Sequence, residues 1–238
     1  MSGHSKWATT HRQKEIADAK KGAIFTKIAN IITIAARKGG DPATNFSLRI
    51  AIDKGRAVNM PKDNIERAVK RGTGEGGGAA IEELTYEGIG PAKAQFIVKS
   101  LTDNKNRSAS QIRHLFTKNG GSFGSVMWNF DQKGVVRIIN DQLSSINKEE
   151  FELELIDQGA DDIISEDEGM TVYVMPSDLQ KIKQFLENKN IQTESADIEF
   201  VAKENLNLSE EEKTQVEKFI EELEDNEDVS DYYTNANI

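Results

Sequence analysis

The sequence predicts an α+β protein in which a helical part precedes parts that contain β-sheets. Three changes of pattern along the chain support this class. Before residue 72, apolar side chains recur with the 3.6-residue period of amphipathic helices. After a glycine-rich stretch, they alternate as in strands. From Gly134 onward, the expected elements follow the order β-α-β-β-α-β, which is that of a ferredoxin-like unit.

The first 78 residues are predicted to form a basic helical domain that ends in a glycine linker. A polar helix over residues 9–19 has few apolar positions, so we expect it to be mobile or ordered by a partner. The next helix has one apolar face, and its periodic residues are Ile24, Ile28, Ile31, Ile32 and Ala35. Asn45 is expected to cap a third helix, and Pro61 suits the first turn of a fourth that Gly72 ends.

Residues 72–78 read Gly-Thr-Gly-Glu-Gly-Gly-Gly and have two interpretations. A phosphate-binding loop would need a preceding strand and a following Gly-Lys-Ser or Gly-Lys-Thr, and the chain has neither. Glycine-rich segments behave as flexible connectors. The stretch is therefore predicted to be a flexible joint.

A strand hairpin is predicted after the joint, with alternation around Tyr86 and Phe96 and a turn at residues 88–91. Residues 103–108 read as a polar loop, after which Ser108 or Ser110 would cap a helix. Residues 126–130 alternate again and predict another strand.

The ferredoxin-like unit is expected to begin with a strand at residues 135–139 and to end with one at 191–196. A separate strand is predicted at residues 198–201. Ser209 and Glu212 have the spacing of a capping box for a long helix, and a last strand is expected at residues 229–233.

Composition excludes several classes of protein. The chain has no cysteine, so it forms neither disulfides nor thiolate metal sites. No run of about 18 apolar residues predicts a membrane span, and basic residues interrupt any signal-peptide core near the N-terminus. A cytoplasmic protein is the expectation.

The net charge of -10 conceals a strong asymmetry. Residues 1–72 contain 15 Lys and Arg against 6 Asp and Glu, a net charge of +9. The remaining residues contain 15 against 34, a net charge of -19. A basic segment of this size indicates binding to polyanions, while the acidic remainder would restrict which face can approach nucleic acid.

Catalysis finds little support in the sequence, and no enzyme activity, cofactor or metal is predicted. The three histidines, His4, His11 and His114, form no ligand pair at helical spacing. The acidic residues 165–169 lack the ligand spacing of a calcium loop, so they are interpreted as a solvated hairpin turn.

Basic side chains of the first third are the candidate nucleic-acid contacts, because Lys and Arg neutralise phosphates and release counterions. Trp7 either stacks on a base or anchors the first helix in the core. The predicted contacts are Lys6, Trp7, His11, Arg12, Lys14, Lys20, Lys21, Lys27, Arg37 and Lys38. A second contact is assigned to Asn104, Lys105 and Arg107, with an ordinary connection between strand and helix as the alternative.

Several motifs resemble the YebC/PmpR family over essentially the whole chain. They include Gly3-His4-Ser5-Lys6-Trp7, Phe25-Thr26-Lys27, Ala51-Ile52-Asp53-Lys54, Asn59-Met60-Pro61-Lys62-Asp63-Asn64-Ile65-Glu66-Arg67-Ala68, Arg71-Gly72-Thr73-Gly74, Tyr86-Glu87-Gly88 and Leu101-Thr102-Asp103-Asn104-Lys105-Asn106-Arg107. The stretch after Gly74 is richer in glycine than the family pattern, which is expected to loosen the joint.

The resemblance implies three domains. The helical domain would span residues 1–78, a discontinuous α/β domain residues 79–133 and 197–238, and an inserted ferredoxin-like domain residues 134–196. It also implies a DNA-binding transcriptional regulator, or alternatively a ribosome-associated translation factor that binds RNA. From the residues alone, a protein-interaction adaptor using the acidic residues 210–228 and a histidine-dependent hydrolase remain further alternatives.

Overall fold

The computed structural model of the 238-residue chain describes residues 21–77, 80–144, 146–166 and 169–238. These residues form two compact units. One unit consists of residues 130–203, and the other joins the residues before 130 to those after 203. The predicted helix over residues 9–19 lies outside the described residues.

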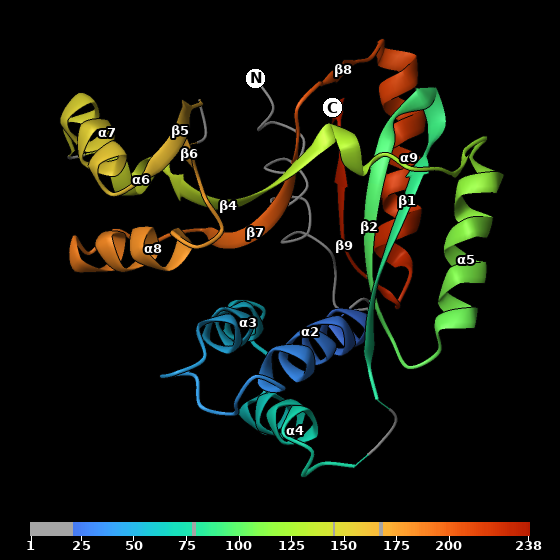
Figure 1. Ribbon diagram of the computed structural model, residues 1–238, viewed down its shortest axis with the longest axis horizontal. Helices are drawn as coiled ribbons and strands as arrows, with labels where there is room; N and C mark the ends of the chain where they lie inside the picture. Colours follow the sequence, from blue (N-terminus) through green and yellow to red (C-terminus); the bar gives the residue numbers. More distant parts are fainter. Residues whose placement is uncertain (1–20, 78–79, 145, 167–168) are drawn as a thin grey trace. The chain divides into compact units, whose positions relative to one another are not determined.

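Three helices form the helical domain: α2 (Lys21–Ala36), α3 (Phe46–Ala57) and α4 (Lys62–Gly72) (Figure 1). Ile32 and Leu48 lie at the centre of their shared core and are completely buried. Asn45 caps α3 as predicted, because its Oδ1 accepts a hydrogen bond of 3.1 Å from the Leu48 amide. Its Nδ2 also donates to the carbonyls of Ala35 and Gly39, so one side chain joins the end of α2 to the start of α3.

The α/β domain contains a four-stranded sheet in the order β3-β1-β2-β9. The predicted hairpin is formed by β1 (Glu82–Ile89) and β2 (Gln95–Thr102), joined by the 3₁₀ turn η2 (Pro91–Lys93). Strand β3 (Ser122–Phe123) pairs with β1, and β9 (Val229–Thr234) pairs with the opposite edge of β2. The C-terminal strand therefore completes a sheet that begins more than 100 residues earlier.

Two helices, α5 (Lys105–Lys118) and α9 (Glu210–Asp225), close the core of this domain. Phe96, Phe116 and Phe219 come from β2, α5 and α9, and their rings meet edge to face with centroids 4.9–6.3 Å apart. Ser209 and Glu212 form the predicted capping box at the start of α9. Strands β8 (Leu206–Asn207) and β10 (Ala236–Asn237) form a separate, two-stranded parallel sheet.

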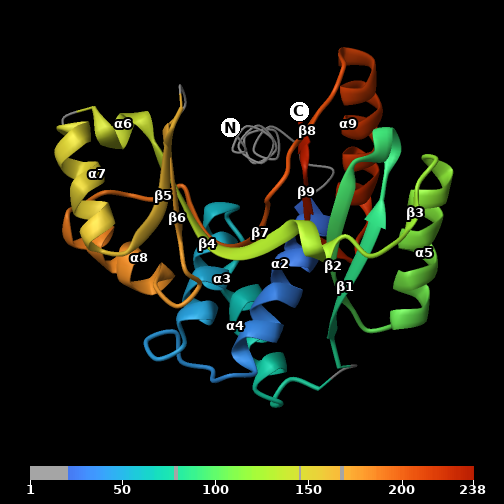
Figure 2. The same ribbon diagram turned by 45° about the horizontal axis from the view of Figure 1, so that its top comes forward.

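The second unit has the predicted β-α-β-β-α-β order. Its elements are β4 (Phe130–Ile139), α6 (Asn140–Leu143), α7 (Lys148–Asp157), β5 (Ala160–Ser165), β6 (Gly169–Val174), α8 (Leu179–Asn188) and β7 (Ser195–Ala202). All strand pairs are antiparallel in the order β5-β6-β4-β7, and α7 and α8 lie on the same side of the sheet (Figure 2).

A buried ion pair crosses from β4 to β7 in this unit. The guanidinium of Arg137 donates hydrogen bonds of 2.7 Å and 3.0 Å to the two carboxylate oxygens of Glu199. Burial acts to lower the pKa of Arg137, but the charge and hydrogen bonds of Glu199 outweigh it and the pKa is raised. Removing either partner would leave an uncompensated buried charge.

Three details of the sequence prediction are wrong. Residues 191–196 and 198–201 do not form separate strands, because Ser195–Ala202 is one continuous strand paired with β4. The helix predicted to begin at Ser108 or Ser110 begins at Lys105, because Asn104 rather than a serine caps it. The predicted strand over residues 126–130 is interrupted by the 3₁₀ turn η3 (Met127–Asn129), which precedes β4.

A close approach of α2 and α4 requires glycine at position 72. A Cβ there would lie 2.3 Å from the Thr33 carbonyl oxygen and 2.6 Å from the Cβ of Ala36. We expect Gly72→Ala to lower the free energy of unfolding by about 1–3 kcal/mol, because the helices would have to separate. Denaturant unfolding followed by circular dichroism measures the change.

Gly22→Ala is the matched control, since a Cβ at this position in α2 meets no described atom within 4 Å. The control should not lower stability, because Gly22 lies in the first described turn of α2 and the added Cβ would meet no described atom. Equal effects of the two substitutions would contradict the packing argument.

The turn between β1 and β2 contains two non-glycine residues in the left-handed region, Ala92 at φ 53° and Lys93 at φ 64°. Such conformations cost energy for residues that have a Cβ. We expect Lys93→Gly to raise the free energy of unfolding by about 0.5–1 kcal/mol. Lys93→Ala, which retains the Cβ, should give no such gain, and equal gains from both would show that the lysine side chain was responsible.

Candidate nucleic-acid interface

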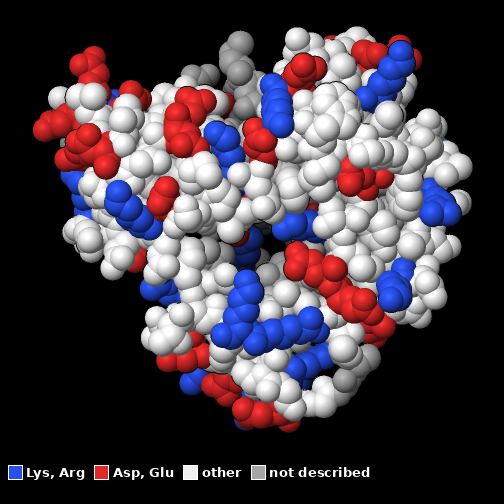
Figure 3. All heavy atoms as spheres, in the orientation of Figure 1, with Lys and Arg blue, Asp and Glu red and all other residues white. Residues whose placement is uncertain are grey.

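The described helical domain retains the basic character predicted for it. Residues 21–72 contain 11 Lys and Arg against 4 Asp and Glu, a net charge of +7. Lys and Arg side chains cluster over the helices of this domain on the face drawn in Figure 3. The exposed cations are Arg37, Lys38, Arg56, Lys62, Arg67 and Lys70.

Of these cations, Arg56 and Lys62 form only weak ion pairs within the domain. Arg56 contacts Asp53 at 3.3 Å and Lys62 contacts Glu66 at 3.5 Å, and both pairs are solvent-exposed. Exposed pairs of this kind contribute little stability, so a phosphate can replace the carboxylate at small cost. Among the described residues, no carboxylate pairs with Arg67 or Lys70.

A hollow of about 520 Å³ lies between the end of α3 and α4. Its apolar lining includes Ile52, Met60 and Ile65, and the charged residues Arg56, Lys62, Glu66 and Lys70 also line it. The turn that joins the two helices places Asn59 at φ 58°, a conformation that asparagine tolerates better than most residues. Cations from two helices are thereby brought to the same side of the domain.

The structure gives the predicted site residues different environments. Lys6, Trp7, His11, Arg12, Lys14 and Lys20 lie outside the described residues, as does the side chain of Lys21. Lys27 donates to the backbone carbonyl of Glu224, and Arg37 donates to that of Ile81. Both side chains therefore connect the helical domain to the α/β domain. Lys38 is exposed.

Arg56, Arg67 and Lys70 were not among the contacts predicted from the sequence. Their spacing contained the signal, since Arg67 and Lys70 are three residues apart and share one face of α4. Lys62 adds a further cation near the start of that helix.

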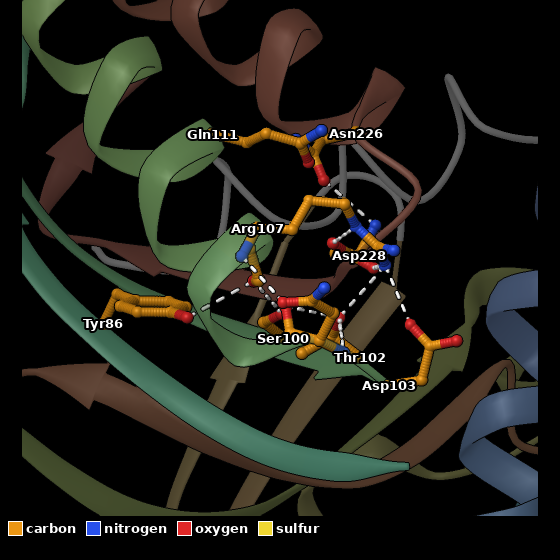
Figure 4. Close-up of polar contacts among 10 residues, drawn as sticks. Tyr86, Ser100, Thr102, Asp103, Arg107, Gln111, Asn226 and Asp228 are labelled. Atoms are coloured by element: carbon orange, nitrogen blue, oxygen red, sulfur yellow. Dashed lines mark hydrogen bonds and ion pairs between the residues drawn. The ribbon is translucent and has the colours of Figure 1, made fainter. Parts of the chain in front are cut away.

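The predicted second contact region is organised around Arg107 (Figure 4). Its guanidinium donates to both carboxylate oxygens of Asp228, at 3.3 Å and 2.9 Å, and also to Thr102 and Asp103. The hydrogen bonds and charge of Asp228 raise the pKa of Arg107 above its ordinary value. Asn104 caps α5, and Lys105 approaches Glu82 at 3.9 Å.

This network joins α5 to the segment before β9. The backbone carbonyl of Asp228 also accepts a 2.9 Å hydrogen bond from the Leu101 amide, so Asp228 binds β2 and α5 together. Arg107 thus has an architectural role that the sequence did not indicate. Whether Asn104, Lys105 and Arg107 also contact nucleic acid stays a prediction.

Two models of known families match almost the entire chain. The model described as "TACO1/YebC protein N-terminal domain" matches residues 5–75, and "TACO1/YebC second and third domain" matches residues 81–236. The chain belongs to the TACO1/YebC family. The resemblance inferred from the sequence motifs is therefore confirmed, as is the mixed α+β fold.

Similar proteins match over nearly their full lengths. A "Probable transcriptional regulatory protein" of Thermoanaerobacter pseudethanolicus is 46% identical and aligns with 100% of this chain and 98% of its own. One from Bacillus licheniformis is 44% identical and aligns with 99% of this chain and 100% of its own. The crystal structure of a conserved hypothetical protein from Aquifex aeolicus superposes with a TM-score of 0.82 at 35% identity. The match covers 93% of this chain and 92% of that chain.

The described residues contain neither a metal-ligand cluster nor a membrane-spanning helix. They contain no group of three or more His, Cys, Asp or Glu side chains arranged to hold a metal ion. His114 is exposed on α5, while His4 and His11 lie outside the described residues. None of the described helices is both long and apolar enough to cross a membrane.

Glu222 on α9 binds the C-terminal end of α5. It accepts hydrogen bonds from the Lys118 ammonium at 2.7 Å and the Asn119 amide at 2.9 Å, which lower its pKa below the ordinary 4.5. A carboxylate with a lowered pKa contributes stability above pH 4.5 and loses it as pH falls through the lowered value. We expect Glu222→Gln to destabilise the protein at pH 7 and to have a smaller effect at pH 3, measured by chemical denaturation.

The control for this experiment is Glu227→Gln, because Glu227 is exposed and has no hydrogen bond or ion pair among the described residues. It should change stability little at either pH. A Glu222→Gln effect that is the same at pH 7 and pH 3 would show that the carboxylate charge is not responsible.

Proposed function

We propose that the protein is a non-enzymatic regulator of transcription that binds DNA through its basic helical domain. The relatives at 44–46% identity are named probable transcriptional regulatory proteins, which supports a role in regulation. The observation that carries the nucleic-acid assignment is the concentration of positive charge in one domain. Residues 21–72 have a net charge of +7, in a chain whose overall charge is -10.

The physical basis of binding is phosphate neutralisation. Each Lys or Arg that replaces a counterion on the duplex releases that counterion into solution, so affinity falls as salt concentration rises. The exposed cations of α4, Arg67 and Lys70, are suited to this contact because no described carboxylate pairs with them. Lys6, Arg12, Lys14, Lys20, Lys21 and Lys38 are proposed to extend the same surface, with Trp7 stacking on a base.

Lys27 and Arg37 have a different role in this proposal. Both donate to backbone carbonyls of the α/β domain, so their loss would disturb the attachment of the helical domain as well as any phosphate contact. They are therefore poor choices for testing binding. Arg67 and Lys70 are better, because their exposed side chains can be changed with little effect on packing.

The acidic remainder of the chain limits how DNA can approach. Helix α9 alone contains eight Asp and Glu against two Lys, and most of these side chains point away from its buried face. Like charges would repel phosphates from this surface. Docking is thereby restricted to the helical domain, which is consistent with a regulator that presents its other surfaces to proteins.

A test uses the double variant Arg67→Glu/Lys70→Glu in the full chain. We expect its affinity for a mixed-sequence DNA duplex, measured by fluorescence anisotropy, to fall at least about ten-fold at low salt. The negative slope of log K against log salt should also become shallower by about 2, because two phosphate contacts are lost.

The matched control reverses two exposed cations outside the helical domain, Lys148→Glu/Lys181→Glu, which changes net charge by the same amount. Its affinity should remain near that of the unchanged protein. An equal loss in both variants would mean that only overall charge matters, and no loss in either would overturn the proposal.

Ribosomal RNA presents the same phosphates as DNA. A parallel measurement therefore distinguishes the transcriptional regulator from the alternative, a ribosome-associated translation factor. The unchanged protein is titrated with the DNA duplex and with purified ribosomes at the same salt concentration. Preferential, Arg67- and Lys70-dependent binding to ribosomes would replace the transcriptional proposal with the translational one.

A further inference from the structure

Helix α7 of the second unit exposes two large apolar side chains on its outer face. Leu153 is 65% exposed and Ile156 is 55% exposed, and residues three apart are neighbours on a helix surface. The inner face of the same helix packs against the unit's core through other side chains. Phe151 and Leu155 are buried there. The Phe151 ring stacks on that of Phe185 from α8, with the ring centroids 6.4 Å apart.

Acidic side chains surround this apolar pair. Within α7 there are five carboxylates and one lysine, and they are Glu149, Glu150, Glu152, Glu154, Asp157 and Lys148. The neighbouring strand β5 adds the exposed Asp161 and Asp162. Figure 3 shows acidic side chains, with uncharged surface between them, where α7 lies in Figure 1.

The whole unit has the same sign of charge. Residues 130–203 contain 7 Lys and Arg against 17 Asp and Glu, a net charge of -10. Nucleic acid would be repelled from such a surface. A cationic partner would be attracted, and it would meet apolar side chains that gain free energy when they leave water.

The geometry favours a helical partner over an added strand. Strand β5 is the edge of the sheet next to α7, but a register shift between Ala160 and Asp162 interrupts its pairing with β6. Charged residues and bulges on an edge strand discourage the addition of another strand. The regular outer face of α7 has no such obstacle.

We propose that the outer face of α7 is a docking surface for a basic amphipathic helix of a protein partner. Apolar side chains of that helix would cover Leu153 and Ile156, and its Lys and Arg side chains would contact the exposed Glu149 and Glu150. This mode of recognition buries the apolar stripe of one helix against that of another. The inference does not depend on which nucleic acid the helical domain binds.

The experiment titrates the full chain with a fluorescein-labelled synthetic helix of leucine and lysine and records fluorescence anisotropy. We expect Leu153→Ser/Ile156→Ser to weaken binding about ten-fold or more. Met175→Ser removes a side chain of the same unit that is 55% exposed, and it should leave binding unchanged. All three replaced side chains are exposed, and thermal unfolding checks that each variant remains folded.

A second pair of variants tests the charges. Glu149→Gln/Glu150→Gln should weaken binding and reduce its salt dependence, while Glu211→Gln/Glu217→Gln on the acidic α9 should not. A matched helix of leucine and glutamate should not bind. A photoreactive group in the basic helix should crosslink to α7.

Four outcomes would overturn the proposal. Equal binding by the Leu153→Ser/Ile156→Ser variant, or crosslinks confined to α9, would show that the probe recognises acidic surface without selecting α7. Self-association of the unchanged protein that this variant abolishes, measured by sedimentation, would identify a second copy of the chain as the occupant. Crosslinking of a photoreactive DNA duplex to α7 would assign the surface to nucleic acid.

Discussion

The side chain of Asn129 holds together two segments that are 75 residues apart in the chain. It donates to the Gln95 side chain at 2.8 Å and to the Glu204 carbonyl at 3.0 Å, and it accepts from the Glu204 amide at 2.9 Å. The second unit leaves and rejoins the α/β domain at these residues. Because both ends are fixed at one place, an entire ferredoxin-like unit can be inserted while β2 still pairs with β9.

Cations of the helical domain serve two purposes that sequence alone does not distinguish. Lys27 and Arg37 donate to carbonyls of the α/β domain, whereas Arg67 and Lys70 remain exposed. The Glu224 carbonyl lies near the C-terminal end of α9, where the helix dipole favours a cation, so part of the positive charge contributes to architecture. The charge count of the domain therefore overstates the charge available to a nucleic acid.

The acidic parts of the chain also differ in how their surfaces are organised. On α9, the apolar residues Val216, Phe219 and Leu223 are fully buried, and the outer face is charged. On α7, Leu153 and Ile156 remain exposed among carboxylates. Both helices would be recognised from sequence as acidic. Only α7 combines charge with apolar surface that is accessible to a partner.

Local signals predicted many of the elements well. Asn45 before α3 and the Ser209–Glu212 capping box gave correct helix starts, because a cap forms between residues only three apart. The start of α5 was missed because Ser108 resembles a cap, whereas its hydroxyl lies buried 2.7 Å from that of Ser100 on the adjacent strand. That contact depends on how β2 and α5 pack, which the local pattern does not contain.

The charge division, the order of elements and the family follow from the amino-acid sequence, since these depend on composition, periodicity and motifs. Which charges are free and which residues join distant segments depends on tertiary packing. Asp228 shows the difference most clearly, because it lies 121 residues from the Arg107 that it binds. No local pattern pairs them, since their contact exists only after the C-terminal strand has joined the sheet. The basic helical domain was visible in the sequence, but the division of its cations between structure and surface was set by folding.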